Sequence, residues 1–154
     1  MSSTHVSASR VIAADAQRLF DIVADPSMHA VIDGSGTVRS VRGGSRKLGL
    51  GDRFTTNMQL GVPYLIANRV VEYEEGRRIA WSHLGGWRWR YEFEPVDDGD
   101  GDGPRTRVTE TFDWTTARSR TYIQLLGWPR RNQVGLERTL DRLDAYVTNK
   151  ASTL

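Results

Sequence analysis

A chain of 154 residues is the size of one domain and can bury a substantial core without disulfides or metal clips. Its 38% hydrophobic and 26% charged residues are ordinary for a globular protein, and the absence of cysteine excludes disulfides, thiolate catalysis and cysteine-ligated zinc. A formal net charge of +2 predicts no nucleic-acid partner, and no apolar run approaches the roughly 20 residues that a membrane helix needs.

The N-terminal part of the chain predicts a strand followed by two short helices. MSSTHVSASR has no basic segment followed by an apolar one, so we expect no secretory signal, a cytoplasmic location and no membrane insertion. Residues 6–12 predict a strand, and Asp15 suits the N-cap of a short helix. The buried stripe of that helix is Ala16, Leu19, Phe20 and Val23. Asp25-Pro26 ends it, and a second helical turn is expected over residues 27–32.

The middle of the chain predicts a series of strands joined by short turns. They cover residues 37–42, 53–60, 64–73, 78–84, 87–96 and 105–114. In residues 53–60, Phe54, Thr56, Met58 and Leu60 share one face. The most regular alternation is in residues 87–96, where the inward set is Trp87, Trp89, Tyr91 and Phe93 and charged residues fill the other face. Short turns between successive strands indicate an antiparallel meander.

The C-terminal part predicts one long amphipathic helix over residues 129–150. Its apolar stripe consists of Leu136, Leu140, Leu143 and Val147. A helix of this kind needs a surface for its stripe, and an antiparallel sheet with one apolar face supplies it. The fold class is therefore α+β.

Several short segments, in this order, carry a resemblance to a known family. They are Ile12-Ala13-Ala14, Leu19-Phe20-Asp21-Ile22, Asp25-Pro26, Arg78-Ile79-Ala80-Trp81, Trp89-Arg90-Tyr91, Thr106-Arg107-Val108-Thr109, and Gly127-Trp128-Pro129 with Leu136, Leu140 and Leu143. The chain resembles the START-like superfamily, also called SRPBCC, and its polyketide cyclase/dehydrase and lipid-transport branch. The resemblance covers essentially the whole chain, so residues 1–154 are expected to form a single START-like domain.

The resemblance implies a helix-grip fold, in which a curved antiparallel sheet of about seven strands wraps around the C-terminal helix. Family members use the cavity between sheet and helix for lipids, sterols, polyketides, hormones or other apolar molecules, and some catalyse cyclisation or dehydration there. The family has no universal catalytic motif, so no catalytic residue is carried over. Fold alone does not settle function.

Glu110 is the first candidate for acid–base chemistry. If Val108, Phe112 and Trp114 face the core, the two-residue period of a strand places Glu110 inside as well. A buried carboxylate needs a partner or takes a raised pKa. Arg69 is the predicted partner, because it shares the more apolar face of its strand with Leu65, Ala67, Val71 and Tyr73. The alternatives are an ion pair that only satisfies itself and a bulge that turns Glu110 outward.

The aromatic face of residues 87–96 has two interpretations, core packing beneath the long helix or the lining of a ligand site. Tyr91 adds a hydroxyl group that needs a partner if it is buried. The facing of Trp81 and His83 depends on the hairpin at Gly85-Gly86. A two-residue turn leaves both outside, where Trp81 would mark a dimer surface; a longer loop or a bulge reverses this. We favour the reversed register because Trp81 needs cover.

No metal or cofactor signature stands out. His29, near Asp33, has two interpretations, a surface position on the second helical turn, which we favour, and a position at a cavity mouth. No histidine has a metal-site spacing. Residues 97–103 are similar to the start of a calcium loop, but the twelfth position is Thr109 and strands flank the segment, so a solvated hairpin loop is expected. We expect no metal and no cofactor.

Together, these observations favour binding of a small hydrophobic or aromatic molecule, lipid- or polyketide-like, between sheet and helix. One alternative is an enzyme of the cyclase/dehydratase type, in which Glu110, Tyr91 or His83 moves protons. Another is a homodimeric interaction protein whose cavity is closed. The predicted ligand-binding residues are Met58, Arg69, Trp81, Trp89, Tyr91, Glu110, Phe112, Tyr122, Leu136 and Leu140.

Overall fold

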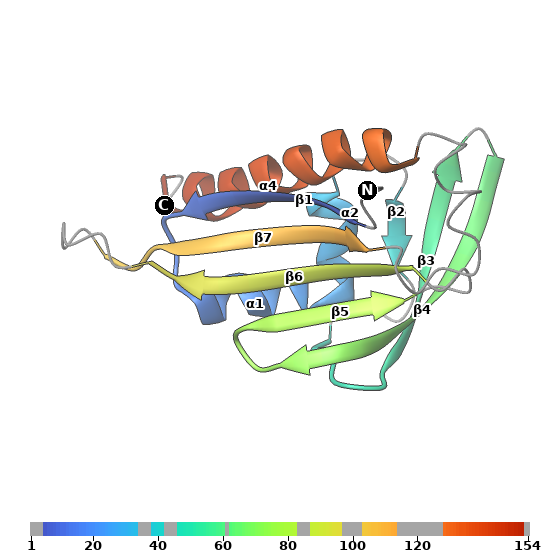
Figure 1. Cartoon of the computed structure of the whole chain (residues 1–154), viewed down its shortest axis with the longest axis horizontal. Helices are drawn as coiled ribbons and strands as arrows, with labels where there is room; N and C mark the ends of the chain where they lie inside the picture. The colour runs from blue at the N-terminus through green and yellow to red at the C-terminus, as the bar shows by residue number, and fades with distance from the viewer. Residues whose placement is uncertain are drawn as a thin grey trace.

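The computed structural model describes residues 5–33, 38–41, 46–60, 62–82, 87–96, 103–113 and 128–152. This part of the chain forms one antiparallel sheet with helices packed on one of its faces (Figure 1). The elements are β1 (His5–Ile12), α1 (Ala16–Val23), η1 (Pro26–Met28), α2 (His29–Ile32), β2 (Val38–Val41), β3 (Arg53–Leu60), β4 (Val62–Glu74), β5 (Arg78–Ser82), β6 (Arg88–Pro95), β7 (Thr106–Asp113) and α4 (Trp128–Ser152).

The seven strands of the described residues lie in the order β1-β7-β6-β5-β4-β3-β2. Strands β2 to β7 are therefore a meander, and β1 joins the sheet beside the last strand. Figure 1 shows α4 running along β1 at one edge, while the paired strands β3 and β4 bend upward at the opposite end of the sheet. A curved sheet around a long C-terminal helix, with two short helices after β1, confirms the predicted helix-grip fold.

The first helices begin and end where the sequence predicts. Asp15 caps α1, since its side chain accepts a hydrogen bond from the backbone N–H of Gln17 at 3.2 Å. Asp25 caps η1 in the same way, through the N–H of Ser27 at 3.0 Å. One face of α1 is fully buried, and its members are Leu19, Phe20 and Val23. These caps and this stripe fix α1 against the sheet.

The register between β5 and β6 places Trp81 inside. Trp81 lies directly opposite Trp89, and Ile79 lies opposite Tyr91, so all four side chains point to the helix-bearing face. Ile79 and Trp81 are buried in the main core. The favoured register is therefore confirmed, and the alternative that exposes Trp81 is wrong. His83 lies outside the described residues.

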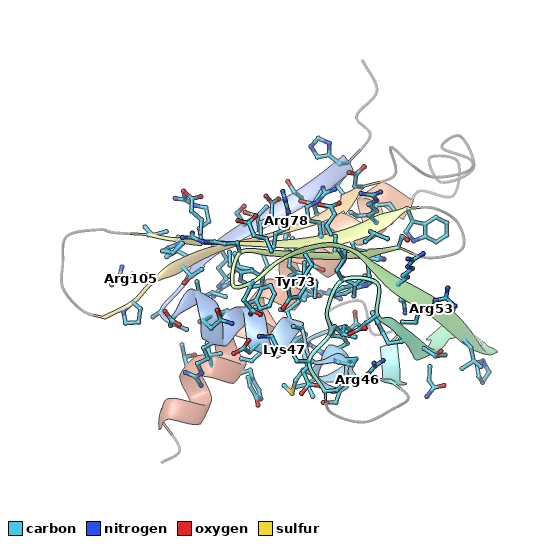
Figure 2. The ribbon with its side chains drawn as sticks, turned by 90° about the horizontal axis from the view of Figure 1, so that it is seen from below. Arg46, Lys47, Arg53, Tyr73, Arg78 and Arg105 are labelled. Carbon is cyan, nitrogen blue, oxygen red and sulfur yellow. The ribbon has the colours of Figure 1, made fainter. Side chains whose placement is uncertain are left out.

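A β-bulge changes the facing of β4 part-way along the strand. The register shifts between Val70 and Glu72, so one extra residue is inserted there. Before the bulge, Asn68 and Val70 are buried while Leu65 is 54% exposed. After it, Tyr73 returns to the inner face, where its ring meets Phe20 edge-on at 5.6 Å (Figure 2). The prediction of one continuous inner face is wrong because it assumed an unbroken two-residue period.

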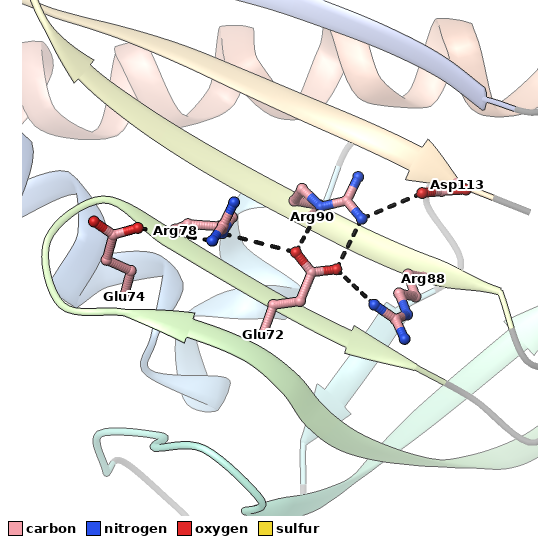
Figure 3. A network of polar contacts seen from close by, with 6 residues as sticks. All are labelled: Glu72, Glu74, Arg78, Arg88, Arg90 and Asp113. Carbon is pink, nitrogen blue, oxygen red and sulfur yellow. Dashed lines mark hydrogen bonds and ion pairs between the residues drawn. The ribbon is translucent and has the colours of Figure 1, made fainter. Parts of the chain in front are cut away.

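The outer face of the sheet carries a network of ion pairs centred on Glu72 (Figure 3). Its carboxylate accepts two hydrogen bonds from Arg90, at 3.0 and 2.8 Å, and one from Arg88 at 2.8 Å. Arg90 also contacts Asp113 at 3.2 Å, and Arg78 lies 3.7 Å from Glu72. The Arg90 contact is the main cause that lowers the pKa of Glu72, and burial partly opposes it. The network connects β4, β5, β6 and β7.

Replacing Glu72 with Gln is expected to lower the free energy of unfolding by about 1–3 kcal/mol at neutral pH, because two arginines lose a charged, hydrogen-bonded partner. A carboxyl group with a lowered pKa in the folded state stabilises the fold above its unfolded pKa, and this stabilisation is lost as the pH falls through the lowered value. Urea unfolding at several pH values should therefore show that the difference in free energy of unfolding between wild type and Glu72→Gln shrinks in acid.

Glu94→Gln is the matched control. Glu94 is 71% exposed, and its ion pair with Arg107 is long, at 3.6 Å. We expect this variant to change stability by less than about 0.5 kcal/mol. Equal effects of Glu72→Gln and Glu94→Gln would show that the network does not stabilise the sheet.

Gly76 holds the turn between β4 and β5 in a left-handed conformation, with φ +74, and a Cβ there would lie 2.7 Å from Oε1 of Gln17. Gly51 has φ +84 and nothing within 4 Å of the same position. Alanine at Gly51 should cost about 1–2 kcal/mol for the backbone alone. Alanine at Gly76 should cost more, because Gln17 has to leave its hydrogen bonds to Asp21 and Glu75.

Adding Gln17→Ala to Gly76→Ala should remove the extra cost in a denaturant-unfolding double-mutant cycle. Equal losses for Gly51→Ala and Gly76→Ala would contradict the role of Gln17.

Candidate functional site

Glu110 is a buried carboxyl group in the middle of β7. It lies opposite Tyr91 of β6 and Ala8 of β1, and only 4% of it is exposed. The Tyr91 hydroxyl donates a hydrogen bond to the carboxyl group. The Oε2 atom has no hydrogen-bond partner among the described residues. Buried polar atoms in proteins are almost always paired, so this one requires an explanation.

The electrostatics of the pair favour its neutral form. Burial is the main cause that raises the pKa of Glu110 well above its ordinary value, and the negative charge of Asp33 adds to it. The hydrogen bond from Tyr91 acts in the opposite direction and is the second-largest effect. Burial also raises the pKa of Tyr91, with a further contribution from the charge of Glu110. A carboxylic acid beside a phenol can therefore donate or accept a proton.

An aromatic group built around Trp81 adjoins this pair. The Trp81 ring stacks on His29 at 4.7 Å and 21°, meets Phe54 edge-on at 5.5 Å, and lies 5.6 Å from Tyr91. His29 Nε2 lies 2.8 Å from the carbonyl oxygen of Val23, so Nε2 carries the hydrogen. Burial lowers the pKa of His29, and the imidazole is neutral around pH 7.

The expectation that His29 lies on the surface is wrong. It is buried because α2 turns one face to the sheet, and this face includes Ile32, three residues further on. The signal was present in the sequence as an i, i+3 pair, but four residues are too few to establish a helical period. Phe54 and Thr56, which the sequence places on one face of β3, are both buried, although the contact of Phe54 with His29 could not be foreseen.

The apolar side chains of the described residues form two clusters, and Glu110 lies between them on β7. The main cluster includes Val108, and a smaller one is formed by Phe112 with Val6, Trp87 and Trp89. Trp89 packs against both clusters and lies 4.7 Å from Phe112. The polar pair thus interrupts the apolar surface at the middle of the sheet.

The stripe of α4 shows the same division. Leu140, Leu143 and Val147 belong to the main cluster, whereas Leu136, equally buried, belongs to neither cluster of the described residues. Leu136 is one helical turn closer to the N-terminal end of α4.

Arg69 is not the partner of Glu110. Its side chain is exposed, and it pairs in register with Arg53 and Ser82, which puts it on the other side of the sheet from Val70. The prediction failed because the bulge at residues 70–72 reverses the facing of the first half of β4.

The other predicted site residues have mixed outcomes. Trp81, Tyr91, Glu110 and Phe112 are buried on neighbouring strands, and Trp89 is half-buried beside them. The backbone of Met58 pairs with that of Tyr64, but its side chain is outside the described set, as are Tyr122 and His83. Because Trp81 is buried, it does not form the outer patch on which the dimer alternative depended, and a homodimer stays a prediction.

Two negative findings apply to the described residues. They contain no group of three or more His, Cys, Asp or Glu side chains with the geometry of a metal site. None of their helices combines the length and the apolar character that crossing a bilayer requires.

Comparison with known proteins identifies a matching family and a relative. The sequence profile of the family described as "Polyketide cyclase / dehydrase and lipid transport" matches residues 3–148. The uncharacterized protein Rv0088 of Mycobacterium tuberculosis is 41% identical over 152 residues, which are 95% of this chain and 66% of that protein. The chain thus spans slightly less than two thirds of this relative.

Solved structures share the fold at low sequence identity. Protein Ms6760 from Mycobacterium smegmatis has a TM-score of 0.66 and 18% identity, covering 96% of this chain and 92% of its own. DynU16, described as a protein in the dynemicin biosynthetic locus, has a TM-score of 0.64 and 15% identity, covering 96% of this chain and 48% of its own. The fold, the family profile and the element order agree: the chain belongs to the polyketide cyclase/dehydrase and lipid-transport family of the START-like (SRPBCC) superfamily.

Proposed function

We propose that the protein binds a small hydrophobic molecule between the sheet and α4, with a polar atom of the ligand directed at Glu110. The observation that carries this proposal is the buried, unpartnered Oε2 atom. Leaving such an atom unsatisfied costs about 1–3 kcal/mol, and an apolar residue of similar size avoids the cost. Residues that lower stability in this way are typical of sites where a ligand completes the contacts.

The surroundings suit an apolar or planar ligand. Trp89 and Phe112 lie on one side of the Tyr91–Glu110 pair along the strands, and Trp81 lies on the other strand beside Tyr91. Aromatic rings offer a large apolar area and stacking faces, and a few polar groups among them fix the orientation of a ligand. Membership of a family described by polyketides and lipids supports the same class of molecule.

A second candidate function is a cyclase/dehydratase activity at the same place. The observation that favours it is the raised pKa of Glu110 next to the Tyr91 hydroxyl. A protonated carboxyl group can give its proton to a leaving hydroxyl group, which departs as water, and the carboxylate so formed can take up the proton that the adjacent carbon of the substrate loses. Tyr91 would hold the carboxyl group in position through its hydrogen bond.

Ligand binding is tested with native mass spectrometry of the purified chain and titration with the neutral probe Nile red. We expect a bound small molecule in the mass spectrum, or saturable probe binding that Glu110→Leu changes. Glu92→Gln, on the outward face of β6, is the control that leaves binding unaltered. A folded wild-type protein that shows neither a bound mass nor saturable probe binding would contradict the proposal.

The two functions are separated by the neutral variants Glu110→Gln and Tyr91→Phe. In a carrier, each variant should change ligand affinity by less than about tenfold, because shape is preserved and one hydrogen bond is altered. In an enzyme, each should slow turnover by about 100-fold or more with little change in binding. Single-turnover product analysis by mass spectrometry on the retained ligand gives the readout, and unchanged product formation in both variants would rule out acid–base catalysis by this pair.

The protonation of Glu110 is tested by stability as a function of pH. Its pKa in the folded state is raised above the ordinary value of 4.5, so the folded chain keeps a proton that the unfolded chain releases. Stability is therefore fully present below about pH 4.5 and is lost as the pH rises toward the folded pKa, at up to about 1.4 kcal/mol per pH unit. Urea unfolding should show this loss in wild type and in Glu92→Gln, and its absence in Glu110→Gln. Parallel curves for all three proteins would contradict burial of a protonated acid.

A further inference from the structure

The Tyr91–Glu110 pair at the centre of the sheet affects which hydrophobic molecules can bind beside it. We propose that the interior site takes neutral apolar molecules that carry a ketone, phenol or alcohol oxygen, and that it excludes carboxylates such as fatty-acid anions. This inference rests on the proposed function of the same site. It concerns the charge of the ligand, which the family and the fold leave open.

The Tyr91–Glu110 pair leaves part of its hydrogen-bonding capacity unused. Tyr91 uses its only hydrogen toward Glu110, so the phenol oxygen can accept but not donate further. Oε2 of Glu110 is the atom without a partner among the described residues. In the protonated acid, one oxygen donates and the other accepts, so a ligand hydroxyl or carbonyl can complete the set. A hydrocarbon cannot.

The described groups around the pair are uncharged or negative. On β6 and β1 its neighbours are the phenol of Tyr91 and the methyl group of Ala8. Asp33, which follows α2, is the charge that acts on both members of the pair, and it is negative. The only ring on α2 that titrates, His29, is neutral because burial lowers its pKa.

The cations of the described residues that lie closest to the pair and to Asp33 already have partners. On α4, Arg142 donates a hydrogen bond to the backbone carbonyl oxygen of Asp33 at 2.8 Å, at an exposed position. On the inner side of β1, Arg10 is bound to Asp144 at 2.7 Å and to Asp141 at 3.3 Å, at an exposed position. Arg90, next to Tyr91 in the chain, points to the outer face and contacts Glu72 (Figure 3). The stripe of α4 contributes uncharged side chains, and these include Leu136, Thr139 and Leu140.

A carboxylate entering this interior would therefore lose its hydration, approach the negative charge of Asp33, and meet only cations that already have partners. Burying an unpaired ionised carboxylate is strongly unfavourable, whereas a neutral hydroxyl group that gains one hydrogen bond is not. We expect a preference of about 3–10-fold for a neutral hydroxylated ligand over its hydrocarbon parent. The carboxylate analogue should bind at least about 100-fold more weakly than the hydroxylated one.

Three probes with one ring skeleton test the inference at pH 7: naphthalene, 2-naphthol and 2-naphthoate. Affinities are measured by quenching of tryptophan fluorescence and by calorimetry, on wild type, Glu110→Leu, Glu110→Gln and the outward-facing control Glu92→Gln. Circular dichroism establishes that each protein is folded. Wild type and Glu92→Gln should prefer 2-naphthol and reject 2-naphthoate.

The two Glu110 variants distinguish hydrogen bonding from simple packing. Glu110→Leu should lose the preference for 2-naphthol and bind naphthalene at least as well as wild type does. Glu110→Gln keeps a neutral donor and acceptor and should retain the preference for 2-naphthol. Because glutamine has nearly the shape of glutamate, Glu110→Gln also tests the hydrogen bonding without changing the packing of the core.

The remaining outcomes show whether the inference alone fails or the proposed function fails with it. Equal binding of all three probes by wild type, or a preference for 2-naphthol that survives in Glu110→Leu, would overturn selection by charge and leave the proposed function in place. Failure of folded wild type to bind any of the three would overturn the proposed function and the inference with it.

Discussion

The alignment of β5, β6 and β7 is the constraint on which the interior depends. Trp81, Trp89 and Phe112 form one row across these strands, and Ile79, Tyr91 and Glu110 form the next. Because side chains of a strand alternate between faces, this register admits Glu110 to the core together with the aromatic rings. A shift of β7 by one residue would send the carboxyl group to solvent, just as a shift of β6 would bring Arg90 inside. The apolar rows on both sides of Glu110 make that shift too costly, so the strands hold an acid in an apolar interior.

Most of the fold follows from local signals in the sequence. The caps Asp15 and Asp25, the alternation of residues 87–96 and the stripe of α4 each predict their element, because each depends on neighbours within a few residues. The burial of Glu110 could be predicted for the same reason, from Val108 and Phe112. Arg69 could not be placed, since the bulge after Val70 is a property of the pairing between β4 and β5. His29 was missed because its burial depends on Trp81 and Phe54, which are distant in sequence.

The two faces of the sheet shift the pKa of a carboxyl group in opposite directions. On the outside, Glu72 is surrounded by arginines, which lower its pKa, and it contributes to the stability of the sheet. On the inside, Glu110 has a phenol and an unfilled position, and burial raises its pKa. The residue type is the same, so the difference in chemistry comes from the environment alone. Family membership accounts for the architecture, and the selection that we propose for the site would come from these few side chains.

The ion-pair network around Glu72 on the outer face restrains the strands that carry Tyr91 and Glu110. Arg90 is the chain neighbour of Tyr91, and Asp113 is three residues beyond Glu110, so their contact pins together the backbones that carry the phenol and the acid. Glu72 extends the same restraint to β4. Spreading these strands would break several charged contacts at once. The stripe of α4 meets the sheet through non-directional apolar packing, and the ion pairs of the helix with Arg10 lie at its exposed edge. We therefore expect the sheet to act as the fixed wall of the interior and the helix as the wall that yields when a molecule passes in or out.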